Sequence, residues 1–220
     1  MKILAIETST LTGSIALISD EKLLGETTLS VSVRHSERLM PAIEQLLRDA
    51  DTRPKDVDLY AVAEGPGSFT GLRIGIAAAQ GLAMACGKPL AGLSTLRGLA
   101  MNAAFHTGIV VPVLNAFRGE IYYGVYRLEN GLPVPLQEDG VISVDGFVEM
   151  VGAWTETAVL IGNGIELCQP QIPFAANGKI IISSEPLNTP RASNLAFLAG
   201  RLGSSVPSMP VLPRYLRKPG

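Results

Sequence analysis

The chain has 220 residues, 47% apolar and 17% charged, which is enough to bury the core of one domain or of two small ones. Its 18 basic and 20 acidic residues leave a net charge of −2, which excludes strong long-range attraction to nucleic-acid phosphates. Two widely spaced cysteines, Cys86 and Cys168, exclude a disulfide framework. We therefore expect a globular chain with reduced thiols that binds nucleic acid weakly on its own.

Neither a membrane span nor a secretory signal is predicted. The longest nearly apolar stretch, residues 74–86, contains Gln80 and glycines, and it is shorter than the roughly 20 residues that a spanning helix requires. Met1 and Lys2 are followed at once by a strand-like run, without the cleavage site of a signal peptide. We expect a cytoplasmic protein.

The first segments of the chain predict an antiparallel meander followed by a helix. Strand-like runs at 2–7, 13–18 and 23–29 are separated by short polar turns. Residues 36–47 then carry apolar side chains at helical spacing, and His35 or Ser36 is the expected N-cap.

A strand at 58–63, a long helix at 69–86 that ends at Gly87, and a strand at 89–93 come next, and Ser94 is expected to cap a further helix. This order of strands and helices is typical of a ribonuclease-H-like half domain, in which helices cover the sheet.

The second half of the chain weakly repeats this opening. We expect β runs at 109–115, 120–126, 135–142 and 158–161, and helices at 144–152 and 192–202. The repetition predicts an α/β, duplicated fold like that of actin and sugar kinases. Its two subdomains would be residues 1–104 and a less regular, reduced one at 105–220.

The glycine-rich string 65–75 (GPGSFTGLRIG) joins a predicted strand to a helix start. Glycines allow close backbone approach, and unpaired N–H groups at a helix start attract anions. The string lacks the Lys-Ser or Lys-Thr of a P-loop. Both a phosphate site and a purely structural turn remain open; for a phosphate or nucleotide, the candidate contacts are Glu7, Thr8, Ser9, Gly65, Gly67 and Ser68.

Small residues recur every three or four positions along the helix predicted at 69–86, namely at 71, 75, 78, 79 and 83. Another backbone could therefore approach this face closely. The sequence leaves open whether it packs inside the protein or against a second chain.

No metal site and no catalytic residues are nominated. His35 has Leu39, not a second histidine, four residues later, and His106 is distant in sequence. Glu7 ends the first strand, but the equivalent position of the second half is Asn115, which offers no anionic oxygen to a cation. Two histidines are little material for a nucleophilic triad.

Several motifs, in order along the chain, carry a family resemblance. They are ILAIETST at 3–10, RHSE at 34–37, the glycine string at 65–75, GLSTL at 92–96, RGEIY at 118–122 and PRYLR at 213–217. Together they resemble the TsaB family, also called YeaZ. Residues 128–190 contribute no recognisable motif.

The resemblance implies an actin-like (ASKHA) fold and a non-catalytic subunit that partners the larger paralogue TsaD and the ATPase TsaE. In that assembly TsaD transfers threonylcarbamoyl to adenosine in tRNA. The subunit would form a homodimer when alone, meet tRNA only through the complex and need no cofactor, with ATP or ADP binding at the level of the complex. The implied partner and dimer surface comprises His35, Leu39, Met40, Ile43, Gly71, Leu72, Gly75, Ala78, Ala79 and Leu82.

Departures from the family pattern concern the strand ends. TsaB members usually carry aspartate where this chain has Glu7, and an Asp-Ala-Arg run where it has Asn115-Ala-Phe117. TsaD has an H-x-x-x-H pattern that is missing at residues 35–39. The alternative function is an enzyme of the same fold, either an ATP-dependent kinase or a glycopeptidase.

Overall fold

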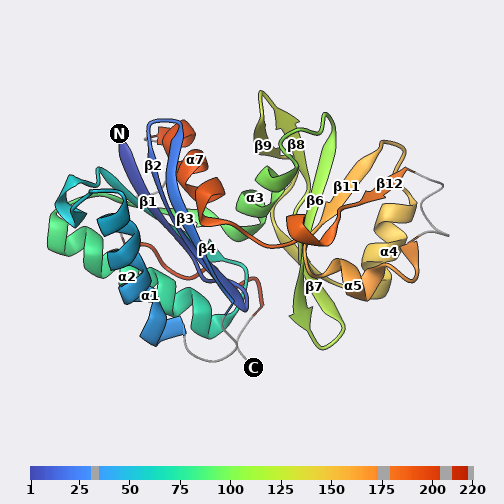
Figure 1. The fold of residues 1–220 in the computed structure, drawn as a ribbon. Helices are drawn as coiled ribbons and strands as arrows, with labels where there is room; N and C mark the ends of the chain where they lie inside the picture. Colours follow the sequence, from blue (N-terminus) through green and yellow to red (C-terminus); the bar gives the residue numbers. More distant parts are fainter. Residues whose placement is uncertain (31–34, 173–178, 204–209, 218–220) are drawn as a thin grey trace. The chain divides into compact units, whose positions relative to one another are not determined.

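The structure is a computed structural model that describes residues 1–30, 35–172, 179–203 and 210–217, without the side chains of residues 29, 30 and 35–37. The chain forms two compact units (Figure 1). The first comprises Met1–Gly98 and Pro190–Tyr215, and the second comprises Leu99–Thr189 and the C-terminal residues from Leu216.

The first unit is built on a mixed sheet with the strand order β3-β2-β1-β4-β5. The strands are β1 (Lys2–Glu7), β2 (Thr12–Ser19), β3 (Lys22–Ser30), β4 (Leu59–Gly65) and β5 (Leu90–Ser94). The first three form the expected antiparallel meander, whereas β4 and β5 join in parallel to β1. The carboxyl ends of β1, β4 and β5 therefore lie at one edge, where the glycine-rich turn begins.

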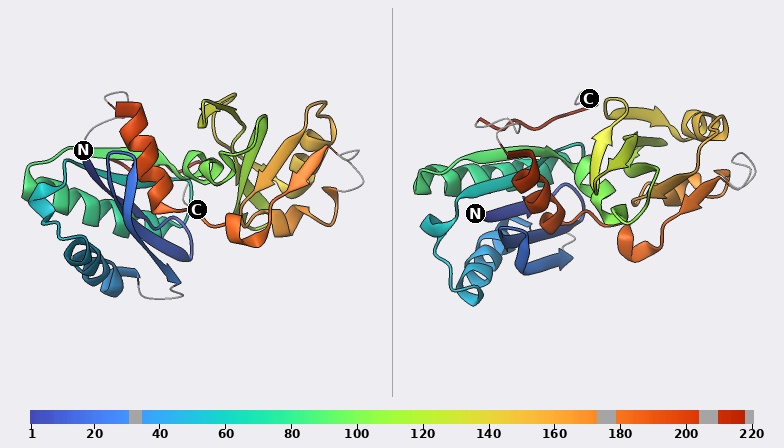
Figure 2. Two further views of the ribbon diagram at one scale, coloured as in Figure 1. Left: turned by 45° about the horizontal axis from the view of Figure 1, so that its top comes forward. Right: turned by 90° about the horizontal axis from the view of Figure 1, so that it is seen from above.

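Helices cover both faces of this sheet (Figures 1 and 2). Helices α1 (His35–Asp49) and α2 (Phe69–Cys86) pack on one face, and α7 (Ala192–Leu202) packs on the other. Because side chains alternate along a strand, Thr8 at the end of β1 meets α2 while Ile3 meets α7. Coverage on both faces explains why β1 and β4 are almost continuously apolar.

The bounds of α2 match the sequence prediction. The hydroxyl of Ser68 accepts a hydrogen bond from the amide of Gly71 at 3.2 Å, which caps the helix start. Gly87 ends the helix in the left-handed conformation, at φ 63°. The following β5 leads into α3 (Thr95–Ala100), where Ser94 accepts a hydrogen bond from Arg97 as expected of a cap.

The helix α7 belongs to the first unit, although it follows the second unit in sequence. The division expected from the sequence, into residues 1–104 and 105–220, placed this helix in the second subdomain. Its first amide, Ala192 N, donates to Ser14 Oγ of β2 at 2.6 Å. The meander would otherwise leave one apolar face without a cover, and α7 supplies that cover. A division drawn at a single point along the chain cannot represent a unit assembled from its two ends.

Glu26 of β3 supplies a second anchor for α7, and we expect its removal to destabilise the first unit. Its side chain is 6% exposed, accepts the amide of Ser193 at 3.0 Å and pairs with Arg191. The change Glu26→Ala leaves that amide without its acceptor, at an expected cost of about 1–3 kcal/mol in the free energy of unfolding measured with urea.

A matched control removes another glutamate that pairs with an arginine of α7. Glu21 and Arg201 lie 2.6 Å apart, but both side chains are more than half exposed. The change Glu21→Ala should therefore cost less than about 1 kcal/mol. Equal losses for the two variants would show that Glu26 does not anchor the helix.

The second unit has the strand order β10-β7-β6-β11-β12, with β8 paired to β6 and β9. Its elements are β6 (Ile109–Phe117), β7 (Glu120–Tyr123), β8 (Tyr126–Glu129), β9 (Leu132–Pro135), β10 (Gly140–Ser143), α4 (Val144–Gly152), β11 (Ala158–Ile161), α5 (Ile165–Cys168) and β12 (Ile180–Ile182). Short 3₁₀ turns occur in the first unit as η1 (Pro54–Asp56) and in the second unit as η2 (Met101–Ala103) and η3 (Glu185–Leu187). Phe147 of α4 and the inward residues of β6 and β11 form its core.

The β runs predicted at 120–126 and 135–142 are wrong as single strands. The first breaks at Gly124, between β7 and β8. In the second, only Pro135 belongs to β9 and residues 140–142 to β10, and residues 136–139 lie in neither strand. Both β7 and β8 pair with β6, but β7 also pairs with β10 and β8 with β9, a non-local choice that the hydrophobic pattern does not contain. The predictions of α4 and β11 are confirmed.

Candidate functional site

The carboxyl end of β1 places a buried acid beside the glycine-rich turn. Glu7 is fully buried, and its Oε1 accepts the amide of Ser9 at 2.6 Å. Among the described residues its Oε2 has no partner, and neither has the buried hydroxyl of Ser9. Burial raises the pKa of Glu7 to about 7, partly offset by hydrogen bonding from Ser9. Near neutral pH this carboxyl group is therefore substantially protonated.

The glycine-rich turn uses its own donors and acceptors. Ser68 N donates to Ser9 O at 2.7 Å, Gly71 N donates to Ser68 Oγ, and Leu72 N donates to Ser68 O. A Cβ atom at Gly67 would overlap the backbone of Ser9. The candidate phosphate contacts lie near one another, but much of the donor capacity is satisfied within the chain. The geometry favours a structural strand-to-helix turn.

The described residues contain no cluster of three or more His, Cys, Asp or Glu side chains that could hold a metal ion. Asn115, at the end of β6, has a structural use, because its Oδ1 accepts the amide of Phe117 at 2.7 Å.

The structure corrects part of the predicted partner surface. A Cβ atom at Gly71 or Gly75 would overlap Thr8, whose hydroxyl donates to Gly71 O at 2.8 Å. The small-residue face of α2 is therefore the face on which the helix packs against its own β1. The predicted surface residues that are buried inside the first unit are Leu39, Ile43, Gly71, Leu72, Gly75 and Ala79.

The remaining predicted surface residues stay accessible. Met40 is 45% exposed, and Ala78 and Leu82 are partly exposed. His35 begins α1, but its side chain lies outside the described residues. Helix α2 has a mean hydropathy of 1.3 over 18 residues, of which 33% are buried. Length and composition alone would also suit a membrane span, but its glycine face packs on β1 as in a core helix.

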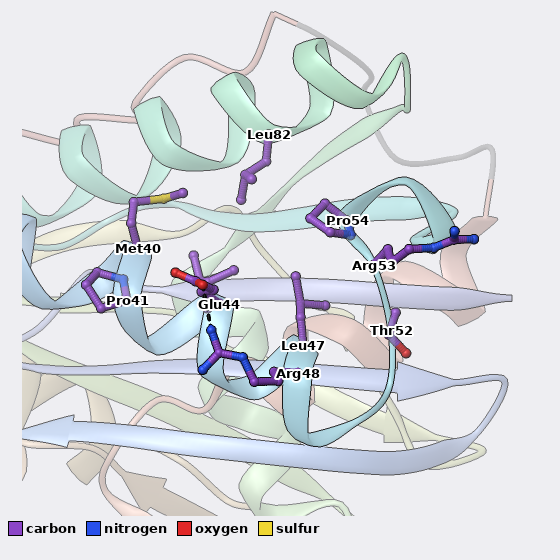
Figure 3. A pocket seen from close by; sticks show the side chains of 10 residues that line it. Met40, Pro41, Glu44, Leu47, Arg48, Thr52, Arg53, Pro54 and Leu82 are labelled. Atoms are coloured by element: carbon purple, nitrogen blue, oxygen red, sulfur yellow. Dashed lines mark hydrogen bonds and ion pairs between the residues drawn. The ribbon is translucent and has the colours of Figure 1, made fainter.

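An apolar groove of about 480 Å³ opens between α1, α2 and η1 (Figure 3). Leu82 points from α2 towards α1, and Met40 lies across the opening from it. Glu44 and Arg48 pair at 2.6 Å beside the groove. The lining residues are Met40, Pro41, Ile43, Glu44, Leu47, Arg48, Thr52, Arg53, Pro54 and Leu82. The sequence indicated this surface through the amphipathic pattern of α1.

Tyr215 of the C-terminal motif packs onto the start of α2, a contact that the sequence analysis did not predict. The rings of Tyr215 and Phe69 stack at 5.2 Å, and Arg73 lies 3.9 Å from the centre of the Phe69 ring. Arg73 Nε also donates to the Tyr215 hydroxyl at 3.0 Å. Arg214 N donates to Glu64 O, next to Gly65. The match of this motif to the family pattern was the available signal, but it did not reveal the contact.

The β6–β7 hairpin, whose strand-turn-strand order the sequence predicted, carries backbone strain that the sequence did not indicate. Phe117 has a φ of 61° and Arg118 a φ of 56°, and neither is glycine. Each such residue costs about 1–2 kcal/mol relative to the right-handed region. The two-residue loop Arg118-Gly119 is a turn of the I′ type, in which Asn-Gly is the favoured pair. Strain of this kind is found most often at functional sites.

Two sheets in two units, each with helices on its sheet, define the class of the protein as the duplicated actin-like (ASKHA) fold. The ROK hexokinase from Thermus thermophilus has this fold; it superposes with a TM-score of 0.53 over 92% of this chain and 100% of that chain, at 13% identity. Similarity at this level shows the fold alone. The fold class predicted from the sequence is confirmed.

Closer relatives define the family. The family model "TsaD: tRNA N6-adenosine threonylcarbamoyltransferase" matches residues 24–200. The Bacillus subtilis "tRNA threonylcarbamoyladenosine biosynthesis protein TsaB" is 35% identical over 99% of this chain and 94% of its own length. The structure of YeaZ from Pseudomonas aeruginosa superposes with a TM-score of 0.84 at 28% identity, covering 98% of this chain and 99% of that chain. The chain belongs to the TsaB (YeaZ) family.

Proposed function

We propose that this chain is a non-catalytic partner subunit that binds TsaD and TsaE and supports the transfer of threonylcarbamoyl to adenosine in tRNA. Support comes first from its family, because the Bacillus subtilis relative is named for the biosynthesis of threonylcarbamoyladenosine in tRNA. The match extends over nearly the whole length of both chains, so the proposal concerns the whole subunit.

The strand ends support a role without catalysis. Enzymes of the actin-like fold commonly position a metal-nucleotide with carboxylates at these points. Here Glu7 is buried with its pKa raised to about 7, which weakens its negative charge near neutral pH, and Asn115 accepts the amide of Phe117 in the β6–β7 hairpin. Both side chains therefore have structural uses. ATP or ADP would then be a requirement of the assembled complex.

The observation that carries the partner role is the apolar surface of α1 and α2. The groove between them is apolar, Met40 and Met84 are 45% and 71% exposed, and seven of the 18 residues of α2 are exposed. Contiguous exposed apolar surface of this kind marks a protein interaction site. We propose that TsaD occupies it in the complex and that a second copy of this chain occupies it when TsaD is absent. Such a complex would act on tRNA in the cytoplasm.

Placing a charge on this surface should prevent association while leaving the fold intact. The change Met40→Glu puts a carboxylate where binding would desolvate it, and we expect TsaD to bind at least about tenfold more weakly by calorimetry. A matched control is Ile181→Glu, because Ile181 in the second unit is 46% exposed and lies outside the proposed surface. Circular dichroism verifies that both variants fold.

Outcomes against the proposal are specific. If folded Met40→Glu binds TsaD as tightly as the parent chain does, α1 and α2 do not form the interface. If the parent chain does not bind TsaD at all, the partner role itself is wrong. Robust ATP hydrolysis or peptidase turnover by the purified chain, abolished by Glu7→Gln, would instead support the kinase or glycopeptidase alternative.

A further inference from the structure

Phe117 and Arg118 lie at the tip of the β6–β7 hairpin of the second unit. The Phe117 side chain is 67% exposed, and Arg118 is exposed. Within the part of the chain that the structure describes, Arg118 has no hydrogen-bond or ion-pair partner. Both residues occupy left-handed backbone conformations, where Gly or Asn would be less strained.

The hairpin tip is held firmly despite this strain. Asn115 Oδ1 accepts the amide of Phe117, and Asn163 Oδ1 accepts the amide of Asn115 at 3.0 Å. Val144 N, at the start of α4, donates to Gly119 O at 3.0 Å. Arg217 donates to Ala116 O at 3.1 Å and lies 3.4 Å from Glu120. The exposed ring is therefore presented on a braced loop, so little conformational entropy is lost when it is contacted.

The size of this feature indicates the kind of partner. A stable protein interface buries roughly 800 Å² on each side around an apolar centre. Within the described residues of β6 and β7, Phe117 is the one large apolar side chain that is exposed, so the tip offers a single ring beside a single unpaired cation. A ring and a guanidinium match one nucleotide, because a base stacks on the ring and the guanidinium pairs with a phosphate.

We propose that the Phe117-Arg118 tip contacts an unpaired nucleotide of the tRNA substrate, with Phe117 stacking on the base and Arg118 pairing with a phosphate. The inference rests on the proposed function, which brings tRNA to the complex. One stacked base contributes only about five- to hundredfold in affinity. The contact is therefore consistent with weak binding of tRNA by the isolated chain, whose net charge is −2.

Affinity of the assembled complex for tRNA tests this contact. With TsaD and TsaE present, Phe117→Ala should weaken tRNA binding about tenfold at fixed salt. Phe105→Ala is the matched control, because Phe105 in the same unit is 76% exposed and lies outside the hairpin. Arg118→Asn creates the favoured Asn-Gly turn pair, so the variant should keep the fold. It should also weaken tRNA binding and reduce the slope of log affinity against log salt concentration by about one.

Photo-crosslinking identifies what the tip touches. With p-benzoylphenylalanine in place of Phe117, we expect a crosslink to tRNA, and with the same group in place of Phe105 we expect none. The experiment is run with the complex and with the isolated chain at low salt, so it reports on the tip even if TsaD does not bind. A crosslink to a protein chain, equal tRNA crosslinks at both positions, or no tRNA crosslink in either sample would overturn the proposal.

Discussion

The change Gly71→Ala is expected to destabilise the first unit by about 3 kcal/mol or more. Gly71 lies in the first turn of α2, and a Cβ atom there would overlap the backbone carbonyl of Thr8. Backbone at the end of β1 cannot move aside as a flexible side chain could, so α2 would have to shift away from the sheet. Overpacking of this kind outweighs the gain of about 1 kcal/mol in helix propensity.

The same substitution elsewhere in α2 provides the control. Gly81 is exposed, and a Cβ atom there would meet nothing within 4 Å. We expect Gly81→Ala to stabilise the chain by about 0.5–1 kcal/mol in the same denaturant measurement. If Gly71→Ala and Gly81→Ala have equal stabilities, α2 does not pack on Thr8 as described. A loss of TsaD binding in Gly71→Ala would follow from misfolding, so only exposed positions such as Met40 can test the interface.

The second large effect is a dependence of stability on pH that originates in Glu7. Burial raises its pKa from 4.5 to about 7. The folded state therefore binds a proton more tightly than the unfolded state, and stability from this group is fully present below about pH 4.5 and is lost as pH rises through 7. The full shift corresponds to about 3 kcal/mol.

The variant Glu7→Gln isolates this contribution. Its amide cannot ionise, so its free energy of unfolding should gain about 2–3 kcal/mol relative to the parent between pH 5 and pH 8. Taking the difference between the two proteins cancels the other groups that titrate, including Asp20 and Asp56, whose pKa values are lowered. A difference that stays constant with pH would refute the buried, protonated state.

Local signals in the sequence were sufficient for several elements. Ser68 and Gly87 mark the ends of α2, and they do so through contacts with their own neighbours in sequence. The meander of β1–β3 follows from alternating runs and short polar turns. Family membership could likewise be predicted, because it depends on the order of motifs and not on their packing. Each helix end, strand and motif needs only residues that lie close together in the chain.

Packing between distant segments decided the rest. The small residues of α2 were visible in the sequence, but only the position of Thr8 against Gly71 and Gly75 shows that their face points inward and leaves Met40 and Leu82 accessible. The return of α7 to β1 and β2 depends on an uncovered sheet face that no local pattern records. The sequence by itself determined the fold class, the family and the main helices. Which faces are buried, and that burial raises the pKa of Glu7, were decided by tertiary structure, because burial is a property of segments brought together from far apart in the chain.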